Sequence, residues 1–134
     1  LPLLFNTKGT VDEGGRASVK GVTKQPKTYQ TYTKDPINPA DGVYSGKTSG
    51  TGTPEQNIAK RDKNHHMNET HKTAKLDQSS NNSSAIRGRE QYNIDKHGGA
   101  RSEGGTSGNR NRSISTTNKK AKEYYEANRK EFGI

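Results

Sequence analysis

The chain has 134 residues, of which only 23% are hydrophobic and none is tryptophan, so it can form at most one domain with a small core. It contains no cysteine and no apolar run long enough to cross a bilayer, which excludes a disulfide framework, a thiolate metal site and a membrane span. Because 23 Lys and Arg residues exceed 14 Asp and Glu residues, the net charge of +9 favours a polyanionic partner, nucleic acid first and an acidic protein second.

Residues 1–27 contain Gly14 and Gly15 and scattered lysines without a sustained hydrophobic period, which is typical of a linker or a loosely packed N-terminal arm. The first residue is not methionine, and the apolar run that follows it is too short for a signal peptide. We therefore expect a piece of a longer polypeptide, with one folded domain over residues 28–134.

Two segments have the composition of β-strands. Residues 28–34, TYQTYTK, and residues 42–48, GVYSGKT, are rich in aromatic and β-branched side chains. The segment DPINPADG between them contains two prolines and an Asp-Gly pair, which favour a turn. The two strands should therefore pair as an antiparallel hairpin.

The second of these segments also contains Gly46-Lys47-Thr48, which is similar to the end of a phosphate-binding loop. That loop requires four residues between its first glycine and the Gly-Lys pair, so that successive amides surround the phosphates. Here Gly42 and Gly46 enclose only three residues, and the Val-Tyr pair between them favours a strand. We therefore expect no nucleotide cofactor.

A helix is predicted directly after Thr53, which can act as its N-cap, with a proline at the first helical position and Gln56 completing a capping box. Along this helix Ile58, Arg61 and His65 have the spacing i, i+3 and i+7. The spacing predicts that all three side chains share one face.

A second helix is predicted over residues 85–99, AIRGREQYNIDKHGG, with its two final glycines as the stop signal. Ile86, Glu90 and Ile94 follow one another at intervals of four residues, so a carboxylate lies on the apolar stripe of this helix. A chain that only bound nucleic acid would gain nothing from such a carboxylate, whereas a metal-dependent nuclease requires one.

A third strand is expected over residues 72–78, ended by the polar run SSNNSS, and a third helix over residues 118–133. Together these segments predict an α/β (α+β) fold. It consists of a small three-stranded antiparallel sheet flanked by helices that start near Pro54, Ala85 and Lys119.

The predicted elements carry the parts of a site that cleaves phosphodiesters. Such chemistry needs a group that deprotonates water, a cation that neutralises charge on the phosphoryl oxygens, and usually a divalent metal on a hard oxygen ligand. The candidate groups for it are Tyr32, Tyr44, Arg61, His65 and Glu90. The residues expected to bind the phosphates of a nucleic acid are Lys47, Arg61, Arg87 and Arg89.

The order and spacing of these residues resemble those of the GIY-YIG nuclease superfamily over residues 28–118. In that family a tyrosine on the first strand precedes a Tyr-x-Gly on the second, then a helix with Arg and His, then a helix with a metal-binding Glu. Tyr32 in TYT matches the tyrosine of GIY, and Tyr44 and Gly46 in VYSG match YIG. The Arg, His, Glu and late Asn of the family fall on Arg61, His65, Glu90 and Asn109.

The resemblance implies a metal-dependent endonuclease that hydrolyses phosphodiester bonds, with DNA as the expected substrate and RNA left open. It implies that Glu90 holds Mg²⁺ or Mn²⁺, that Tyr32 is the general base assisted by Tyr44 or His65, and that Arg61 stabilises the phosphoryl group. A tyrosine of pKa about 10 is a poor base at neutral pH, so Arg61 and the metal are expected to lower the pKa of Tyr32.

Three stretches are also similar to the nuclease modules at the C-terminal ends of bacterial polymorphic toxins: VYSGKTSGTGTPEQNIAKRD, AIRGREQ and GGARSEGGTSGN. This likeness implies a domain secreted as the C-terminal part of a larger protein and delivered into the cytoplasm of a competing bacterium. It also implies a cognate immunity protein, which the net charge of +9 predicts to be acidic.

Alternatives remain open at this point. Glu90 could form a structural ion pair with Arg87 or Arg89. A His-metal (ββα) nuclease would need His66 and His97 on one ion, and on a helix the neighbours His65 and His66 should point apart. A basic module that binds nucleic acid without cleaving it, or an arm that folds on a partner, would also fit the composition.

Overall fold

The computed structural model describes residues 25–134, so residues 1–24 of the expected arm lie outside the described residues. Residues 25–27 are exposed and have no regular secondary structure. The strands are β2 (Thr28–Lys34), β3 (Tyr44–Gly50) and β4 (Lys75–Ser80). The helices are α1 (Pro54–Asp62), α2 (Ser83–Lys96) and α3 (Ala121–Phe132).

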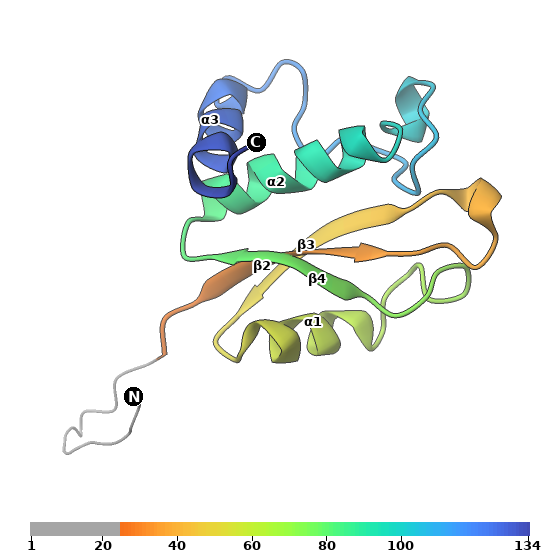
Figure 1. Cartoon of the computed structure of the whole chain (residues 1–134), viewed down its shortest axis with the longest axis horizontal. Coiled ribbons are helices and arrows are strands. Elements are labelled where there is room, and N and C mark those ends of the chain that lie inside the picture. The colour runs from red at the N-terminus through yellow and green to blue at the C-terminus, as the bar shows by residue number, and fades with distance from the viewer. Residues whose placement is uncertain (1–24) are drawn as a thin grey trace.

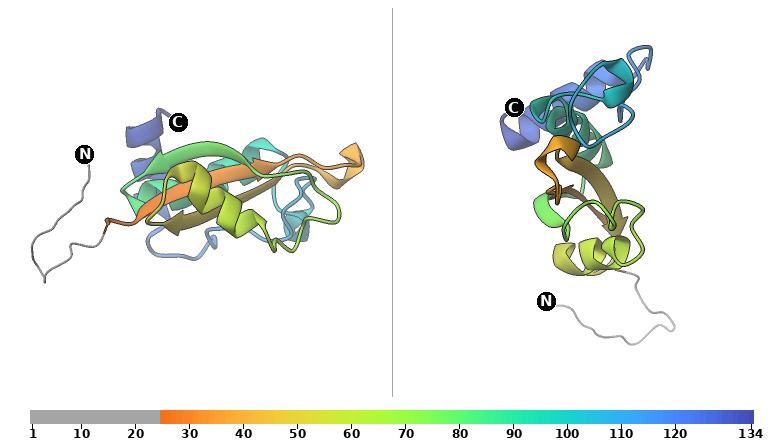
Figure 2. Two further views of the ribbon diagram at one scale, coloured as in Figure 1. Left: turned by 90° about the horizontal axis from the view of Figure 1, so that it is seen from below. Right: turned by 90° about the vertical axis from the view of Figure 1, so that its right-hand side faces the viewer.

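β2 is the central strand of a three-stranded antiparallel sheet with the order β3-β2-β4. α1 covers one face of this sheet and α2 lies on the other, with α3 packed on α2 (Figures 1 and 2). The predicted α+β fold, with three antiparallel strands and three helices, is confirmed. Among residues 25–134 no helix has the length and apolarity that a membrane crossing requires.

Local sequence signals explain where the helices begin and how closely they pack. Thr53 Oγ1 accepts a hydrogen bond from the amide of Gln56 at 3.1 Å, and the Gln56 side chain accepts from the amide of Thr53 at 2.9 Å, which is the predicted capping box. The side chain of Asn82 caps α2 in the same way. A Cβ on Gly88 would lie 2.1 Å from the carbonyl oxygen of Tyr124, so only glycine lets α2 and α3 approach this closely.

The core is small, and many of its side chains are polar. Its large apolar members are Tyr32, Ile86, Ile94 and Ile114, each no more than 1% exposed. Gln30 and Thr31 are buried beside them on β2. Both hydrogen bond to other side chains, as buried polar groups must if burial is not to destabilise the fold.

A buried ion pair joins the end of β2 to the end of α1. Lys34 is fully buried, forms an ion pair with Asp62 and donates to Asn68 Oδ1 at 2.7 Å. The second carboxylate oxygen of Asp62 accepts from the amide of Ala74 at 3.1 Å. These bonds fix both ends of the segment 63–74, which contains no helix or strand.

The end of α1 differs from the prediction. The helix ends at Asp62, and the backbone carbonyl of Asp62 accepts a hydrogen bond from Asn68 Nδ2 at 2.7 Å. His65 therefore lies in the loop that follows, and the expected helical face of Ile58, Arg61 and His65 is wrong. The spacing alone could not reveal the long-range bonds that turn the chain away from the helix axis.

Two strand boundaries also differ from the prediction. β3 begins two residues later than expected, so Gly46-Lys47-Thr48 lies inside a paired strand and forms no phosphate loop. β4 covers residues 75–80 rather than 72–78, and Ser79 and Ser80 continue it because they pair with β2. Pairing with the central strand thus outweighs the turn preference of a serine run.

Candidate functional site

Tyr32 lies in the middle of the central strand and pairs with Gly46 on β3. Its side chain is 1% exposed. A Cβ on Gly46 would lie 2.5 Å from both Cζ and Oη of Tyr32, far inside the ordinary contact distance. Gly46 is therefore the residue that lets the tyrosine ring lie across β3.

His65 forms a hydrogen bond with Tyr32 through its ring nitrogen Nε2. The distance between His65 Nε2 and Tyr32 Oη is 2.9 Å, and the amide of Met67 donates to His65 Nδ1 at 3.0 Å. An amide can only donate, so Nδ1 carries no proton and neutral His65 has its proton on Nε2. We therefore assign Nε2–H as the donor to Tyr32 Oη, which leaves the hydroxyl proton of Tyr32 free for another acceptor.

The charge states of this pair follow from burial. Burial, and then the nearby Arg61 guanidinium, lowers the pKa of His65 to about 4, so the ring is neutral at pH 7. Burial also raises the pKa of Tyr32, and Arg61 offsets only part of that rise. Arg61 thus lowers the pKa of Tyr32 as expected, but desolvation of the phenolate is the larger effect and the net pKa lies above its ordinary value.

Tyr44, the first residue of β3, lies beside Tyr32 and His65 and completes the cluster. Its ring centroid lies 6.5 Å from that of Tyr32 and 5.1 Å from that of His65. Burial raises the pKa of Tyr44, the Glu90 carboxylate raises it further, and Arg61 lowers it. Glu90 also raises the pKa of Tyr32, so the five predicted catalytic side chains lie close enough to influence one another electrostatically.

Two further histidines surround Tyr44. His66 stacks on His65 with ring centroids 4.6 Å apart and planes at 16°, so the expectation that the two point apart is wrong. That expectation assumed a helix, and the helix has already ended. No sequence pattern pointed to His71, which is 3% exposed and donates from Nε2 to the carbonyl of Gly42 at 2.8 Å. Its ring centroid lies 6.4 Å from that of Tyr44.

Glu90 projects from α2 into a cavity of about 250 Å³ whose wall also contains Tyr44 and His66. Its only hydrogen bond among residues 25–134 comes from Ser113 Oγ at 2.5 Å. Within the same residues it forms no ion pair, because Arg87 donates to the carbonyl of Ser113 at 3.2 Å instead. Burial raises the pKa of the Glu90 carboxyl, while Ser113, Lys47 and Arg87 lower it.

The surroundings of Glu90 bear on whether a metal ion would fit. Across residues 25–134 no three His, Asp or Glu side chains form a group that could hold a metal. Mg²⁺ does not need such a cage, since it commonly binds through one or two carboxylates together with waters and substrate phosphates. Within residues 25–134 the partly buried Glu90 carboxylate forms no ion pair, and the same cavity is lined by Asn111, whose side chain forms no hydrogen bond among these residues. These hard oxygen donors fit Mg²⁺ or Mn²⁺ bound together with a phosphate.

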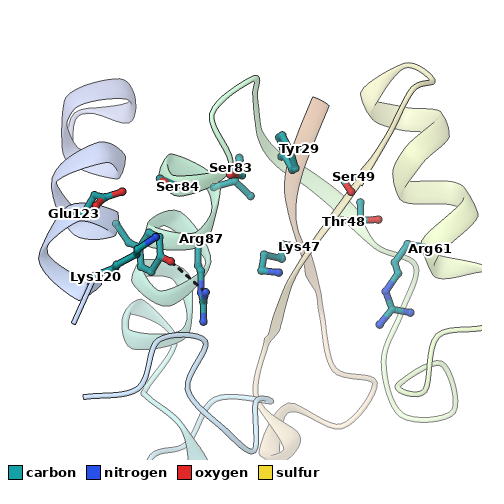
Figure 3. A pocket seen from close by; sticks show the side chains of 12 residues that line it. Tyr29, Lys47, Thr48, Ser49, Arg61, Ser83, Ser84, Arg87, Lys120 and Glu123 are labelled. Carbon is teal, nitrogen blue, oxygen red and sulfur yellow. Dashed lines mark hydrogen bonds between the residues drawn. The ribbon is translucent and has the colours of Figure 1, made fainter. Parts of the chain in front are cut away.

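A basic groove of about 560 Å³ runs beside this cluster (Figure 3). Lys47 of β3 lies between Arg61 of α1 and Arg87 of α2, and Lys120 borders the far side. Among residues 25–134 Arg61 forms no hydrogen bond or ion pair, whereas Arg87 donates to Tyr124 Oη and to the carbonyl of Ser113, and its Nε is buried. The groove therefore offers an anionic ligand the guanidinium of Arg61 together with the positive charges of Lys47, Arg87 and Lys120.

Arg89, predicted from the sequence to be among the phosphate-binding residues, does not line this groove, and its guanidinium is already paired within the protein. Its Nε donates to Asp77 Oδ2 at 2.9 Å, and its guanidinium lies over the rings of Tyr92 and Phe132. Residues two apart on a helix point to different sides. Arg87 and Arg89 could therefore not both face the site.

Asn109 acts on the backbone of β3. Its Oδ1 accepts from the amide of Ser45, and its Nδ2 donates to the carbonyl of Ser45, both at 2.8 Å. The amide side chain thus pairs with the strand as another strand would, between Tyr44 and Gly46. Gln91 similarly accepts from the amides of Ser113 and Ile114 and holds the segment that reaches Glu90.

The two histidines of the alternative metal site are not brought together. His66 lies beside Tyr44 and His65. His97 caps the end of α2, and the charged side chains that affect its pKa are Lys96, Asp35, Asp77 and Lys75. None of these lines the cavities that contain His66.

Comparison of the chain with protein-family models, with curated proteins and with solved structures gives no match.

Proposed function

We propose that this chain is a metal-dependent endonuclease of the GIY-YIG type, which hydrolyses phosphodiester bonds in DNA. The observation that carries the proposal is the Tyr32–His65 hydrogen bond, with Tyr44 beside it and Glu90 and Arg61 close enough to shift the tyrosine pKa values. The basic groove supports a polyanionic substrate, because its cations can neutralise a phosphate backbone.

In the proposed reaction the oxygen of a water molecule forms a bond to phosphorus while the bond to the leaving oxygen breaks. Tyr32, after losing its own proton to solvent, takes a proton from the attacking water, and the leaving oxygen takes one from solvent. His65 donates to Tyr32 Oη throughout, which stabilises the phenolate that forms. The high pKa of Tyr32 makes the phenolate scarce at neutral pH but strongly basic once formed.

Arg61 supplies positive charge to the phosphoryl oxygens and lowers the pKa of both tyrosines. Glu90 is the residue that would hold Mg²⁺ or Mn²⁺. The ion supplies charge stabilisation for the phosphoryl group when it is bound. Gly46 and Asn109 position the tyrosines through the backbone of β3.

The test compares Glu90→Gln with the parent chain in a plasmid-nicking assay with Mg²⁺ or EDTA. We expect EDTA to stop the parent and Glu90→Gln to lose roughly 10²-fold to 10³-fold in rate. DNA affinity and its salt dependence should survive, because the substitution removes a negative charge beside phosphates.

Glu131→Gln is the matched control, since Glu131 is an exposed carboxylate of α3 that lines neither the basic groove nor the Glu90 cavity. It removes the same charge and should leave cleavage unchanged. If Glu90→Gln cuts as fast as the parent while EDTA stops both, Glu90 is not the metal ligand. If the parent binds DNA and never cuts it, the chain is a binding module instead.

The likeness to toxin modules supports a biological setting for this activity. We propose delivery of the domain, as part of a larger secreted protein, into the cytoplasm of a competing bacterium. An acidic immunity protein would then cover Lys47 and Arg61 in the basic groove. The association rate of such an inhibitor should fall steeply between low and physiological ionic strength, and a rate that salt leaves unchanged would contradict this partner chemistry.

A further inference from the structure

A second large cavity adjoins the Glu90 cavity. Its volume is about 630 Å³, within the range of sites that hold small ligands. It shares Tyr44, His66, Arg110 and Asn111 with the cavity that contains Glu90. It shares no residue with the basic groove, so it extends the site in another direction.

The walls of this cavity combine flat or polarisable side chains with free polar ones. His66 is exposed, although one face of its ring stacks on His65. Met67 also lines the cavity and offers a polarisable thioether. The side chains of Arg110 and Asn111 are exposed and form no hydrogen bond with any of residues 25–134.

This chemistry matches a nucleobase better than a phosphate backbone. A base has a flat face that stacks on imidazole and contacts sulfur, and an edge that hydrogen bonds to arginine and asparagine. Bases bound in this way contribute stacking energy without a strict sequence requirement. The basic groove lacks the exposed His-Met wall and instead presents four cations.

We propose that this cavity binds the base of an unpaired nucleotide next to the bond that is cut. The inference rests on the proposed phosphodiesterase function and specifies its substrate as single-stranded or locally unpaired nucleic acid. A base within a duplex is paired at its edge and stacked on both faces, so it would have to leave the helix to enter the cavity. Tyr32 is 1% exposed, which likewise requires the phosphate to reach a recess rather than a flat surface.

The experiment uses an end-labelled single-stranded DNA oligonucleotide, the same strand in a duplex, and the single strand with one abasic position. In the presence of Mg²⁺, the products show the cutting rate at each bond. We expect the single strand to be cut faster than the duplex. We also expect cutting at the bond on one side of the abasic position to fall about fivefold or more, because a stacked base contributes about 1–3 kcal/mol.

Two cavity variants separate base binding from general weakening. Met67→Ala keeps the amide that bonds to His65, and Arg110→Ala removes a free side chain. Each should slow cutting of the intact strand severalfold and leave cutting beside the abasic position unchanged. Lys120→Ala, the matched control in the basic groove, should slow every bond by the same factor.

The outcomes distinguish this inference from the function on which it rests. If the cutting rate beside the abasic position equals that at the same bond of the intact strand, base binding is overturned while the nuclease function stands. The same conclusion follows if the duplex is cut as fast as the single strand and both cavity variants cut at the rate of the parent chain. A parent chain that cuts none of the three substrates in Mg²⁺ or Mn²⁺ would refute both.

Discussion

Replacing Gly46 by alanine would change the geometry of the site while keeping all of its functional groups. The new Cβ would lie 2.5 Å from Tyr32 Oη, and ordinary contact begins near 3.4 Å, so the ring or the strand must move by about 0.9 Å. The bond between Tyr32 Oη and His65 Nε2 is 2.9 Å long, and a shift of this size along it would exceed hydrogen-bonding distance. Misplacement by about 1 Å costs on the order of 10²-fold in rate, and the overpacking costs roughly 1–3 kcal/mol of stability.

The assay for Gly46→Ala is plasmid nicking in Mg²⁺, with circular dichroism to show that the fold persists. Tyr32→Phe in the same background should add little further loss, because the two changes disable one group. Ser49→Ala, on the same strand, should leave the rate unchanged. Full cleavage by Gly46→Ala at an unchanged Tm would refute the reasoning that this glycine positions Tyr32.

Three further predictions concern stability. Lys34→Met should lower stability in urea unfolding by roughly 3 kcal/mol or less, because it leaves the Asp62 carboxylate, which is 14% exposed, without its cation, and adding Asp62→Asn should recover part of that loss. The pKa of His65 is about 4 in the folded chain against 6.5 when unfolded, so the unfolded state binds more protons between these values. The free energy of unfolding should therefore fall by about 3 kcal/mol as pH drops from 6.5 to 4, and His65→Gln should flatten that slope; an equal slope in both proteins would contradict it. Gly88→Ala should lower Tm by forcing α2 away from α3, and an unchanged Tm would count against their close packing.

The sequence predicted the architecture because its signals are local. The capping box at Thr53, the hairpin loop and the spacing of Ile86 and Ile94 each depend on neighbouring residues, and the expected helices and hairpin formed, although some of their boundaries differ by a few residues. Long-range contacts explain what the sequence could not predict. Asp62 ends α1 through bonds to a strand and a distant loop, and no spacing near it encodes those partners.

The residues of the candidate site were likewise predictable only where a local pattern determines their positions. Tyr32 and Tyr44 were predictable because strand pairing brings two short segments together in a fixed register. The position of Arg89 outside the groove could not be predicted, because its partner Asp77 comes from β4 and no local pattern places that strand beside α2. The stacked His65 and His66 could not be predicted because they lie in a loop, where no period relates neighbouring side chains.

The pairing of Asn109 with Ser45 has a consequence for how copies of the chain behave in concentrated solution. β3 is an edge strand, and an unpaired edge is a template for a strand from another molecule. At Ser45 a single amide side chain already occupies both backbone groups, so a second molecule finds nothing to bind there. Loss of that side chain would leave both backbone groups of Ser45 unpaired beside the tyrosines, open to a strand from another copy.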